Sequence, residues 1–223
     1  MVDRIQPPEV GWIAVDAYIA DRLISDDPVA ALVANAAAGL PDIDVSPPQG
    51  RFLHLLARIA GARRILEIGT LGGYSTIWLA RAAGEGGQVV TLEIEPHYAE
   101  VAKANLAAAG LADRVDIRIG AAIDTLAAMT AEPPFDFVII DADKPSNVQY
   151  LHEAIRLARP GATIVVDNVI REGGILDVAS DAPRIQGTRA LFDAVAAEPR
   201  LSASAVQTVG GKKWDGFLLA VLN

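Results

Sequence analysis

The sequence predicts a doubly wound α/β fold with a mostly parallel sheet of seven strands. A chain of 223 residues is a suitable length for one large α/β domain. From residue 64 onward, short apolar segments alternate with segments of helical periodicity, which is typical of parallel strands joined by right-handed helical crossovers. A short glycine-containing turn separates the last two strand-like segments. It predicts a hairpin, and therefore one antiparallel strand at the edge of a Rossmann-like sheet.

Extra helices are expected before the sheet. Apolar residues recur at helical spacing over residues 10–24 and 27–40. Residues 41–48 form a proline-rich loop, and a third helix follows it up to Ala60. We therefore expect one domain, residues 1–223, in which accessory helices (1–60) precede the α/β core (61–223). These helices would either cover an active site or form a dimerisation surface, and the sequence leaves both alternatives open.

The elements of the core follow one another in regular order. Strands are expected at residues 64–68, 88–94, 115–119, 135–141 and 163–166. Helices are expected near residues 75–83, 96–109, 123–130 and 147–158. The chain then ends in a helix at 187–197 and two strands at 202–208 and 217–222, joined by the turn Gly210-Gly211-Lys212-Lys213.

The composition disfavours several classes of function. The formal net charge is −9, and lysine and arginine form pairs rather than stripes, so a small-molecule partner is favoured over nucleic acid. The absence of cysteine rules out disulfides and thiolate metal sites. No segment offers the roughly 18 uninterrupted apolar residues of a membrane helix. The start of the chain, MVDRIQPPEV, lacks the apolar core of a signal peptide, so a cytoplasmic location without membrane attachment is expected.

A glycine-rich turn follows the first expected strand. It reads EIGTLGGYS, in which the glycines let the backbone approach a ligand and Ser75 is placed to cap the next helix. The pattern GxxGG differs from the GxGxxG pattern that cradles a dinucleotide pyrophosphate. Glu93 ends the next strand, where an acidic residue commonly binds ribose hydroxyls. A nucleoside without a pyrophosphate, such as S-adenosylmethionine, fits both features. The structural alternative is a tight turn, with Glu93 as a surface carboxylate.

Charged residues cluster where two later strands end. The apolar run FDFVII is followed by Asp141, Asp143 and Lys144, and Asp167 and Asn168 end the next strand. If the two strands are neighbours, about 4.8 Å apart, the oxygens of Asp141, Asp167 and Asn168 converge. Two carboxylates and an amide carbonyl suit a hard cation such as Mg²⁺. The alternative is ordinary loop chemistry, with Asp143 as a helix cap, Lys144 solvated and an Asx turn at Asp167.

Four ordered motifs resemble those of one enzyme family. They are EIGTLGGYS, VVTLEIEPHYAE, FDFVIIDADK and VVDNVIREGG. From about Ser46 to its end, the chain resembles the cation-dependent O-methyltransferases, which include catechol and caffeoyl-coenzyme A O-methyltransferases. The resemblance implies transfer of a methyl group from S-adenosylmethionine to a hydroxyl of a small catechol-like or otherwise vicinally oxygenated aromatic. The implied ion is Mg²⁺ or another divalent cation such as Mn²⁺ or Ca²⁺.

The resemblance also implies roles for individual residues. The cofactor-binding residues would be Glu67, Gly69, Gly72, Gly73, Ser75, Glu93, Gly120, Ala121, Ala122, Asp141 and Asp143. The metal ligands would be Asp141, Asp167 and Asn168. The catalytic residues would be Lys144, Asp141 and Asn168, with Lys144 as the general base. Glu93 would bind the ribose, and the turn at residues 120–122 would lie near adenine.

Two departures from the animal catechol enzymes concern the acceptor. Asp143 stands where those enzymes have a tryptophan, and residues 203–213 contain no counterpart of their substrate-orienting glutamate. Acceptor selectivity is therefore expected to depend on residues 41–51 and 170–186 and on the residues around Trp214. Trp214 itself would line either an acceptor pocket or a dimer contact. The family and the apolar N-terminal helices favour a homodimer. Three other functions stay open: methylation of a hydroxyuridine in transfer RNA, a non-catalytic S-adenosylmethionine-binding module, and a nicotinamide oxidoreductase, which GxxGG disfavours.

Overall fold

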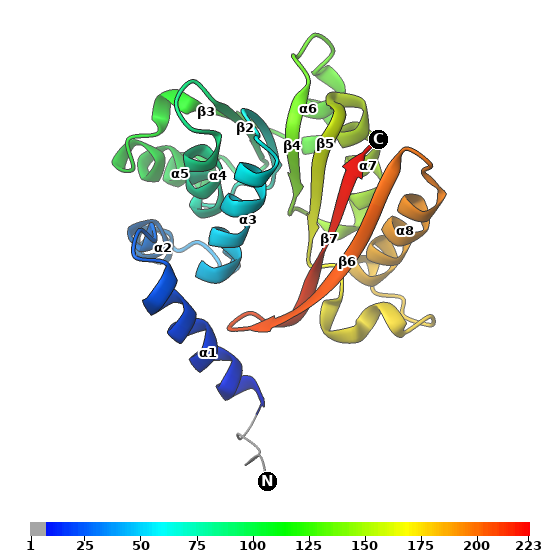
Figure 1. Ribbon diagram of the computed structural model, residues 1–223, viewed down its shortest axis with the longest axis horizontal. Coiled ribbons are helices and arrows are strands. Elements are labelled where there is room, and N and C mark those ends of the chain that lie inside the picture. The colour runs from blue at the N-terminus through cyan, green and yellow to red at the C-terminus, as the bar shows by residue number, and fades with distance from the viewer. Residues whose placement is uncertain (1–7) are drawn as a thin grey trace.

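A seven-stranded sheet forms the centre of the molecule (Figure 1). The computed structural model describes residues 8–223, with side chains from residue 11 onward. The expectation about a signal peptide falls largely on residues 1–7, which lie outside the described residues. The strand order is β3-β2-β1-β4-β5-β7-β6. The strands are β1 (Arg64–Ile68), β2 (Gln88–Glu93), β3 (Val115–Ile119), β4 (Phe135–Ile140), β5 (Ala158–Asp167), β6 (Leu201–Gly210) and β7 (Lys213–Leu222).

The strand directions confirm the predicted fold class. Strands β1 to β5 pair in parallel, and β7 runs antiparallel to both β5 and β6. The hairpin occupies the predicted edge, with β6 outermost and β7 as the reversed strand. The chain reverses its direction of travel across the sheet between β1 and β4, which are neighbours. Open α/β sheets bind their ligands at the carboxyl ends of the strands beside such a switch point.

Helices cover both faces of the sheet. One layer consists of α3 (Pro47–Ile59), α4 (Tyr74–Ala83) and α5 (Pro96–Ala108). The other consists of α6 (Ala122–Ala128), α7 (Asn147–Leu157) and α8 (Pro183–Ala197). Alternate residues of β4 face the two layers: Phe137 and Ile139 pack with the first, and Val138 and Ile140 pack with the second. Burial on both faces explains why this strand reads as a continuous apolar run.

The terminal hairpin is longer than expected. Pairing extends from Leu201 opposite Leu222 to Gly210 opposite Lys213, so the turn itself is short. The outer strand β6 is largely exposed and carries serine, glutamine and threonine, so no apolar run marks its full length. Helix α8 also begins earlier than expected, at Pro183, because proline suits the first helical position.

Strand β5 begins earlier than the expected boundary at residue 163, and its first part pairs irregularly. Ala158 pairs with Phe135, but regular pairing with β4 resumes only at Thr163, opposite Phe137. The register shift accommodates a segment that contains Pro160 and Gly161, residues that weaken a ladder. The expected boundary at residue 163 therefore marks the start of the regular part of the strand.

The accessory section meets the tip of the terminal hairpin. It comprises α1 (Pro8–Leu23), α2 (Val29–Ala37) and α3, and the hairpin tip reaches α1 (Figure 1). The N–H of Gly211 donates to Asp16 Oδ2 at 2.7 Å, and Lys212 Nζ lies 2.5 Å from Asp42 Oδ1. These contacts join the hairpin to the accessory section beside the carboxyl ends of the strands. Within the described residues, no helix combines the length and apolar character needed to cross a membrane.

Candidate active site

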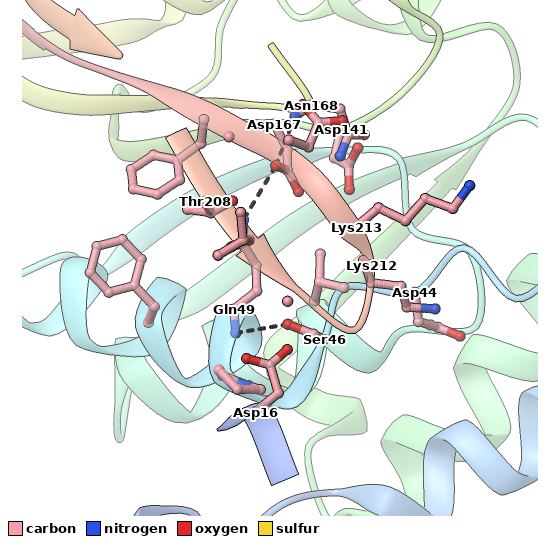
Figure 2. Close-up of a pocket in the computed structure, with 18 of the residues that line it drawn as sticks. Asp16, Asp44, Ser46, Gln49, Asp141, Asp167, Asn168, Thr208, Lys212 and Lys213 are labelled. Atoms are coloured by element: carbon pink, nitrogen blue, oxygen red, sulfur yellow. Dashed lines mark hydrogen bonds between the residues drawn. The ribbon is translucent and has the colours of Figure 1, made fainter. Parts of the chain in front are cut away.

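Two carboxylates and one amide gather at the carboxyl end of the sheet. Ile140 on β4 pairs with Val166 on β5, so Asp141 and Asp167 follow at neighbouring strand ends. Asn168 comes next in the chain, and all three residues line one cavity of about 660 Å³ (Figure 2). The structure thus brings together the three residues predicted to be metal ligands.

Asp167 is a buried carboxylate, with 5% of its surface exposed. Burial and the charge of Asp141 raise the pKa of Asp167 to about 7, although the charge of Lys144 and the N–H of Asn168 oppose the rise. Asp167 Oδ1 accepts hydrogen bonds from the N–H of Asn168 at 2.7 Å and from Gln49 Nε2 at 3.2 Å. The buried carboxylate of Asp167 and the half-buried one of Asp141 repel each other, and a divalent cation would relieve the repulsion. The oxygen donors therefore fit a hard cation such as Mg²⁺.

Lys144 lies at the same rim, on the short helix η2 (Lys144–Ser146). Its side chain is buried, and Nζ donates to Asp141 Oδ1 at 3.0 Å. The backbone oxygen of Lys144 faces Gly187 of α8, where a Cβ atom would come within 2.2 Å of it. The lysine predicted to be the base is therefore fixed beside the two aspartates, and the alternative of a solvated surface lysine is wrong.

Asp143 acts as a helix cap, as the structural alternative predicted. Its side chain accepts hydrogen bonds from the N–H of Ser146, at 3.2 Å, and from the hydroxyl of Tyr150. Burial alone would raise the pKa of Asp143, but the hydrogen bonds from Ser146 and Tyr150 outweigh it, and the pKa lies below its usual value. Contact between Asp143 and a cofactor stays a prediction.

Each of the three glycines of the turn occupies a position where a side chain would be crowded, for a different structural reason. A Cβ on Gly69, whose φ is +100°, would come within 2.2 Å of the backbone oxygen of Asp141, so only glycine lets these two strand ends meet. A Cβ on Gly72 would overlap the amide of Asn35 on α2, and one on Gly73 would crowd Ala102 of α5. Packing alone therefore accounts for Gly72 and Gly73, and their contact with a cofactor stays a prediction.

Ser75 is not the cap of the helix after the turn. Gly73 occupies the cap position, and Ser75 Oγ instead donates to Glu67 Oε1 at 2.6 Å. Glu67 is almost completely buried, and its Oε2 accepts hydrogen bonds from the hydroxyls of Thr76 at 2.5 Å and Thr91 at 2.7 Å. The expected cap is wrong because a buried carboxylate is the stronger acceptor partner for the serine hydroxyl. Glu67 and Ser75 link β1 to α4, and their contact with a cofactor stays a prediction.

Burial of Glu67 should reduce stability at alkaline pH. Its pKa rises to about 7 from 4.5, mainly through burial, so the folded state binds this proton more tightly than the unfolded state. The resulting stabilisation is fully present below pH 4.5 and is lost as the pH rises through about 7. We expect Glu67→Gln to raise the free energy of unfolding at pH 8 by about 1–3 kcal/mol, and by much less at pH 5.

Urea unfolding at the two pH values measures this difference. Glu85→Gln changes an exposed glutamate in the same way and serves as the control. A lower stability of Glu67→Gln than of the wild-type protein at pH 8 would contradict the account.

Glu93 lies at the carboxyl end of β2 and is buried. Its Oε2 accepts the N–H of Leu71 at 2.7 Å and of Thr70 at 3.3 Å, and its Oε1 accepts the N–H of Glu95 at 2.9 Å. A carboxylate offers about four lone-pair sites, so capacity remains for a ribose hydroxyl. The N–H of Gly120 donates to the backbone oxygen of Glu93 at 2.8 Å, which holds the turn at residues 120–122 beside it.

The cavity beside Asp141 has an apolar wall. Four of its lining side chains are apolar yet exposed: Ile43, Phe52, Val206 and Val209. Segments 41–51 and 170–186, expected to set selectivity, both contribute lining residues. Residues around Trp214 also line the cavity, among them Lys213, Asp215 and Gly216, whereas Trp214 itself is not among the described lining residues. A dimer contact of Trp214 stays a prediction. Its ring packs beside Gly173, and its Nε1 donates to Gln207 Oε1 at 3.0 Å.

Two residues of the accessory section belong to the site and were not predicted. Gln49 Nε2 donates a hydrogen bond to Asp167 Oδ1, although the two residues are 118 positions apart in the sequence. Asn35 donates to Asp44 Oδ1 at 3.0 Å and accepts from Asn105 Nδ2 at 2.9 Å, so it connects the cavity wall to the helix behind the glycine turn. Neither residue carries a local sequence signal, because each contact depends on how the accessory helices dock.

Comparison with known proteins identifies the relatives of the chain. A family model described as O-methyltransferase matches residues 27–220. A catechol O-methyltransferase of Mycobacterium tuberculosis is 56% identical, over 100% of this chain and 99% of the relative. One of Niastella koreensis is 47% identical, over 94% and 97%. The crystal structure of an O-methyltransferase from Bacillus cereus in complex with SAH superposes with a TM-score of 0.94, at 53% identity, over 96% of this chain and 99% of that chain.

Proposed function

The chain belongs to the O-methyltransferase family, and on that premise we propose that it transfers a methyl group from S-adenosylmethionine to a hydroxyl of a vicinally oxygenated aromatic, with the help of a divalent cation. The observation that carries the proposal is the convergence of Asp141, Asp167 and Asn168 on one cavity, with the amine of Lys144 bonded to Asp141. The catechol O-methyltransferases of two bacteria, at 56% and 47% identity, support the class of acceptor.

Asp141, Asp167 and Asn168 are the residues that would hold the cation. When bound, it supplies positive charge that makes a nearby acceptor hydroxyl easier to deprotonate. Gln49 keeps Asp167 in place through its amide N–H. Two vicinal oxygens on the acceptor would offer the cation two ligand atoms on the same side of the cavity, which favours a diol over a single phenol.

Lys144 is the residue placed to take the proton. As the free amine, Nζ accepts the proton of the acceptor hydroxyl, and Asp141 Oδ1, 3.0 Å away, then accepts a hydrogen bond from the resulting ammonium. The new bond forms between the acceptor oxygen and the methyl carbon as the bond from sulfur to that carbon breaks. The products are the methyl ether and S-adenosylhomocysteine. The fixed rim contributes mainly alignment of these groups.

The methyl donor would bind on the neighbouring side of the rim. Glu93 has acceptor capacity for the ribose, and the turns after β1 and β3 lie next to it. The SAH complex of the similar Bacillus cereus enzyme supports this assignment. The turn lacks the GxGxxG pattern that a nicotinamide cofactor would require, which argues against the oxidoreductase alternative.

The cavity is large enough for more than one aromatic ring. Its volume of about 660 Å³ lies within the roughly 300–1,000 Å³ typical of sites for drug-sized ligands. We therefore expect a catechol with an apolar substituent to have a higher kcat/KM than catechol itself. The substituent would lie on the wall formed by Phe52, Val206 and Val209.

A panel of acceptors tests the proposal. Methyl transfer from labelled S-adenosylmethionine would be measured with catechol, with catechols carrying longer apolar chains, with the matching monomethyl ethers, and with transfer RNA. Diols should be methylated and the monomethyl ethers should not. Methylation of transfer RNA alone would favour the nucleic-acid alternative, against which the net charge of −9 argues. Failure of every acceptor despite tight cofactor binding would favour a non-catalytic module.

We also propose that the protein forms a homodimer through its accessory helices. Several large apolar side chains on α1 are exposed: Ile13, Val15, Tyr18 and Leu23. Burial of such side chains is the main driving force of obligate association. Sedimentation equilibrium measures the oligomeric state, and a monomer at micromolar concentration would contradict this part of the proposal.

A further inference from the structure

The turn that follows Asp167 has an unusual backbone. Asn168, Arg171 and Glu172 have φ values of +57°, +55° and +56°, and Gly173 follows at +83°. Asparagine tolerates this left-handed region, but arginine and glutamate adopt it only with backbone strain. Such a turn persists only where the surrounding structure holds it. Because the turn begins at Asn168, whatever holds it also fixes a proposed ligand of the cation.

Strand β7 supplies the groups that hold the turn. Three consecutive N–H groups of the turn donate to it. The N–H groups of Ile170 and Arg171 donate to Asp215 Oδ1 at 2.9 and 3.0 Å, and the N–H of Val169 donates to the backbone oxygen of Gly216 at 3.0 Å. Val169 and Ile170 are buried, so losing an acceptor there would leave an N–H group without water to replace it.

The neighbours of Asp215 fit the turn closely. A Cβ on Gly173 would approach the ring of Trp214 to 3.0 Å, so the turn rests on that ring. A Cβ on Gly216 would come within 2.8 Å of Ile170 Cγ1, so glycine lets β7 approach the turn closely enough to accept from it. Two side chains hydrogen-bond the backbone of the turn: Asp167 accepts from the N–H of Asn168 at its start, and Asp215 accepts from the N–H groups of Ile170 and Arg171 farther along.

We propose that Asp215 is a positioning residue, which holds the turn at residues 168–173 so that Asn168 stays beside Asp141 and Asp167. This inference rests on the proposed function, because it concerns the same site. Asp215 acts through the backbone of the turn, and its charge is secondary. Its contact with the guanidinium of Arg171 is long, with Nη1 at 3.6 Å from Oδ2.

A matched control exists at the opposite end of the sheet. Asp136 Oδ2 accepts the N–H groups of Arg63 and Arg64, both at 2.8 Å, and its Oδ1 pairs with Arg159 at 2.6 Å. Like Asp215, it therefore binds two consecutive N–H groups and an arginine. Asp136→Ala removes the same kind of contact at the amino end of β4, away from the cavity. A purely structural role would give Asp136→Ala and Asp215→Ala the same effects.

Titration of the full-length protein with Mn²⁺, followed by electron paramagnetic resonance, measures the effect. Asp215→Ala should bind Mn²⁺ about 10- to 100-fold more weakly than the wild-type protein, whereas Asp136→Ala should change the affinity by less than about threefold. Both variants should lower the melting temperature. Wild-type affinity in a folded Asp215→Ala variant would overturn the inference.

Two conservative variants distinguish the position of the Asp215 oxygens from their charge. They also replace Asp215→Ala in the test if that variant does not fold. Asp215→Asn keeps an acceptor oxygen in place without the charge, and Asp215→Glu keeps the charge but moves it by one methylene. If Asp215 acts by positioning the turn, Asp215→Glu should bind Mn²⁺ more weakly than Asp215→Asn. The reverse order would overturn the inference.

Hydrogen exchange of the peptide that covers residues 168–173 gives a readout that needs no metal. Exchange should be faster in Asp215→Ala than in Asp136→Ala, and equal rates would overturn the inference. If the wild-type protein bound no Mn²⁺ but the exchange difference were present, the cation in the proposed function would be wrong and the anchoring by Asp215 would stand.

Discussion

Asp141→Ala should abolish cation-dependent methyl transfer and leave the binding of S-adenosylhomocysteine largely intact. The change removes one of the two carboxylates at the rim and also the partner of Lys144. Loss of several kcal/mol of electrostatic stabilisation corresponds to a decrease in kcat/KM of about a thousandfold or more. The contacts proposed for the cofactor around Glu93 would be unchanged, so its affinity should fall by less than about tenfold.

Initial rates with a catechol acceptor and calorimetry with S-adenosylhomocysteine measure the two effects. Asp113→Ala, at an exposed position outside the cavity, is the control and should leave both unchanged. Asp141→Asn keeps one oxygen without the charge and should retain more activity than Asp141→Ala. Full metal-stimulated activity in Asp141→Ala would show that Asp141 is not a ligand of the cation.

Lys144→Met should lower kcat by about 10²–10⁴-fold with little change in the affinity for the cofactor. Methionine keeps most of the apolar stem in the buried position of Lys144 and removes only the amine. Lys144→Arg separates two roles of the amine, because a guanidinium retains the ion pair with Asp141 but cannot accept a proton in this pH range. If Lys144 is a general base, Lys144→Arg and Lys144→Met should be equally inactive.

The pH profile of kcat in these variants completes the comparison. The wild-type protein and Lys144→Met should differ in the pH dependence of kcat, because only the wild-type site offers a group that takes the proton of the acceptor hydroxyl. Lys103→Met, on the exposed side of α5, is the control. If Lys144→Arg kept near wild-type activity, Lys144 would act through its charge and not as a base.

The sequence predicted the rim of the site because the rim consists of strand ends. A strand buried on both faces is a continuous apolar run, and the break into Asp141 marks where it leaves the core. The same reasoning located Asp167 and Asn168, and the parallel order placed all three at one end of the sheet. These predictions needed only the alternation of strands and helices.

The contacts made from other elements could not be predicted in this way. Gln49 meets Asp167 only because α3 docks beside β5, and Asn35 reaches Gly72 only because α2 docks on the glycine turn. Ser75 had the right type and position for a cap, but burial of Glu67 offered it a different partner. The role of Asp215 was not predicted, since its bonds to Ile170 and Arg171 depend on the antiparallel pairing of β7.

Metal removal tests the central claim most directly. Wild-type protein treated with a chelator would be assayed for methyl transfer from S-adenosylmethionine to the best diol of the panel, before and after Mg²⁺ or Mn²⁺ is returned. The account predicts loss of activity on chelation and recovery with the cation. Undiminished methyl transfer in the presence of the chelator would contradict it.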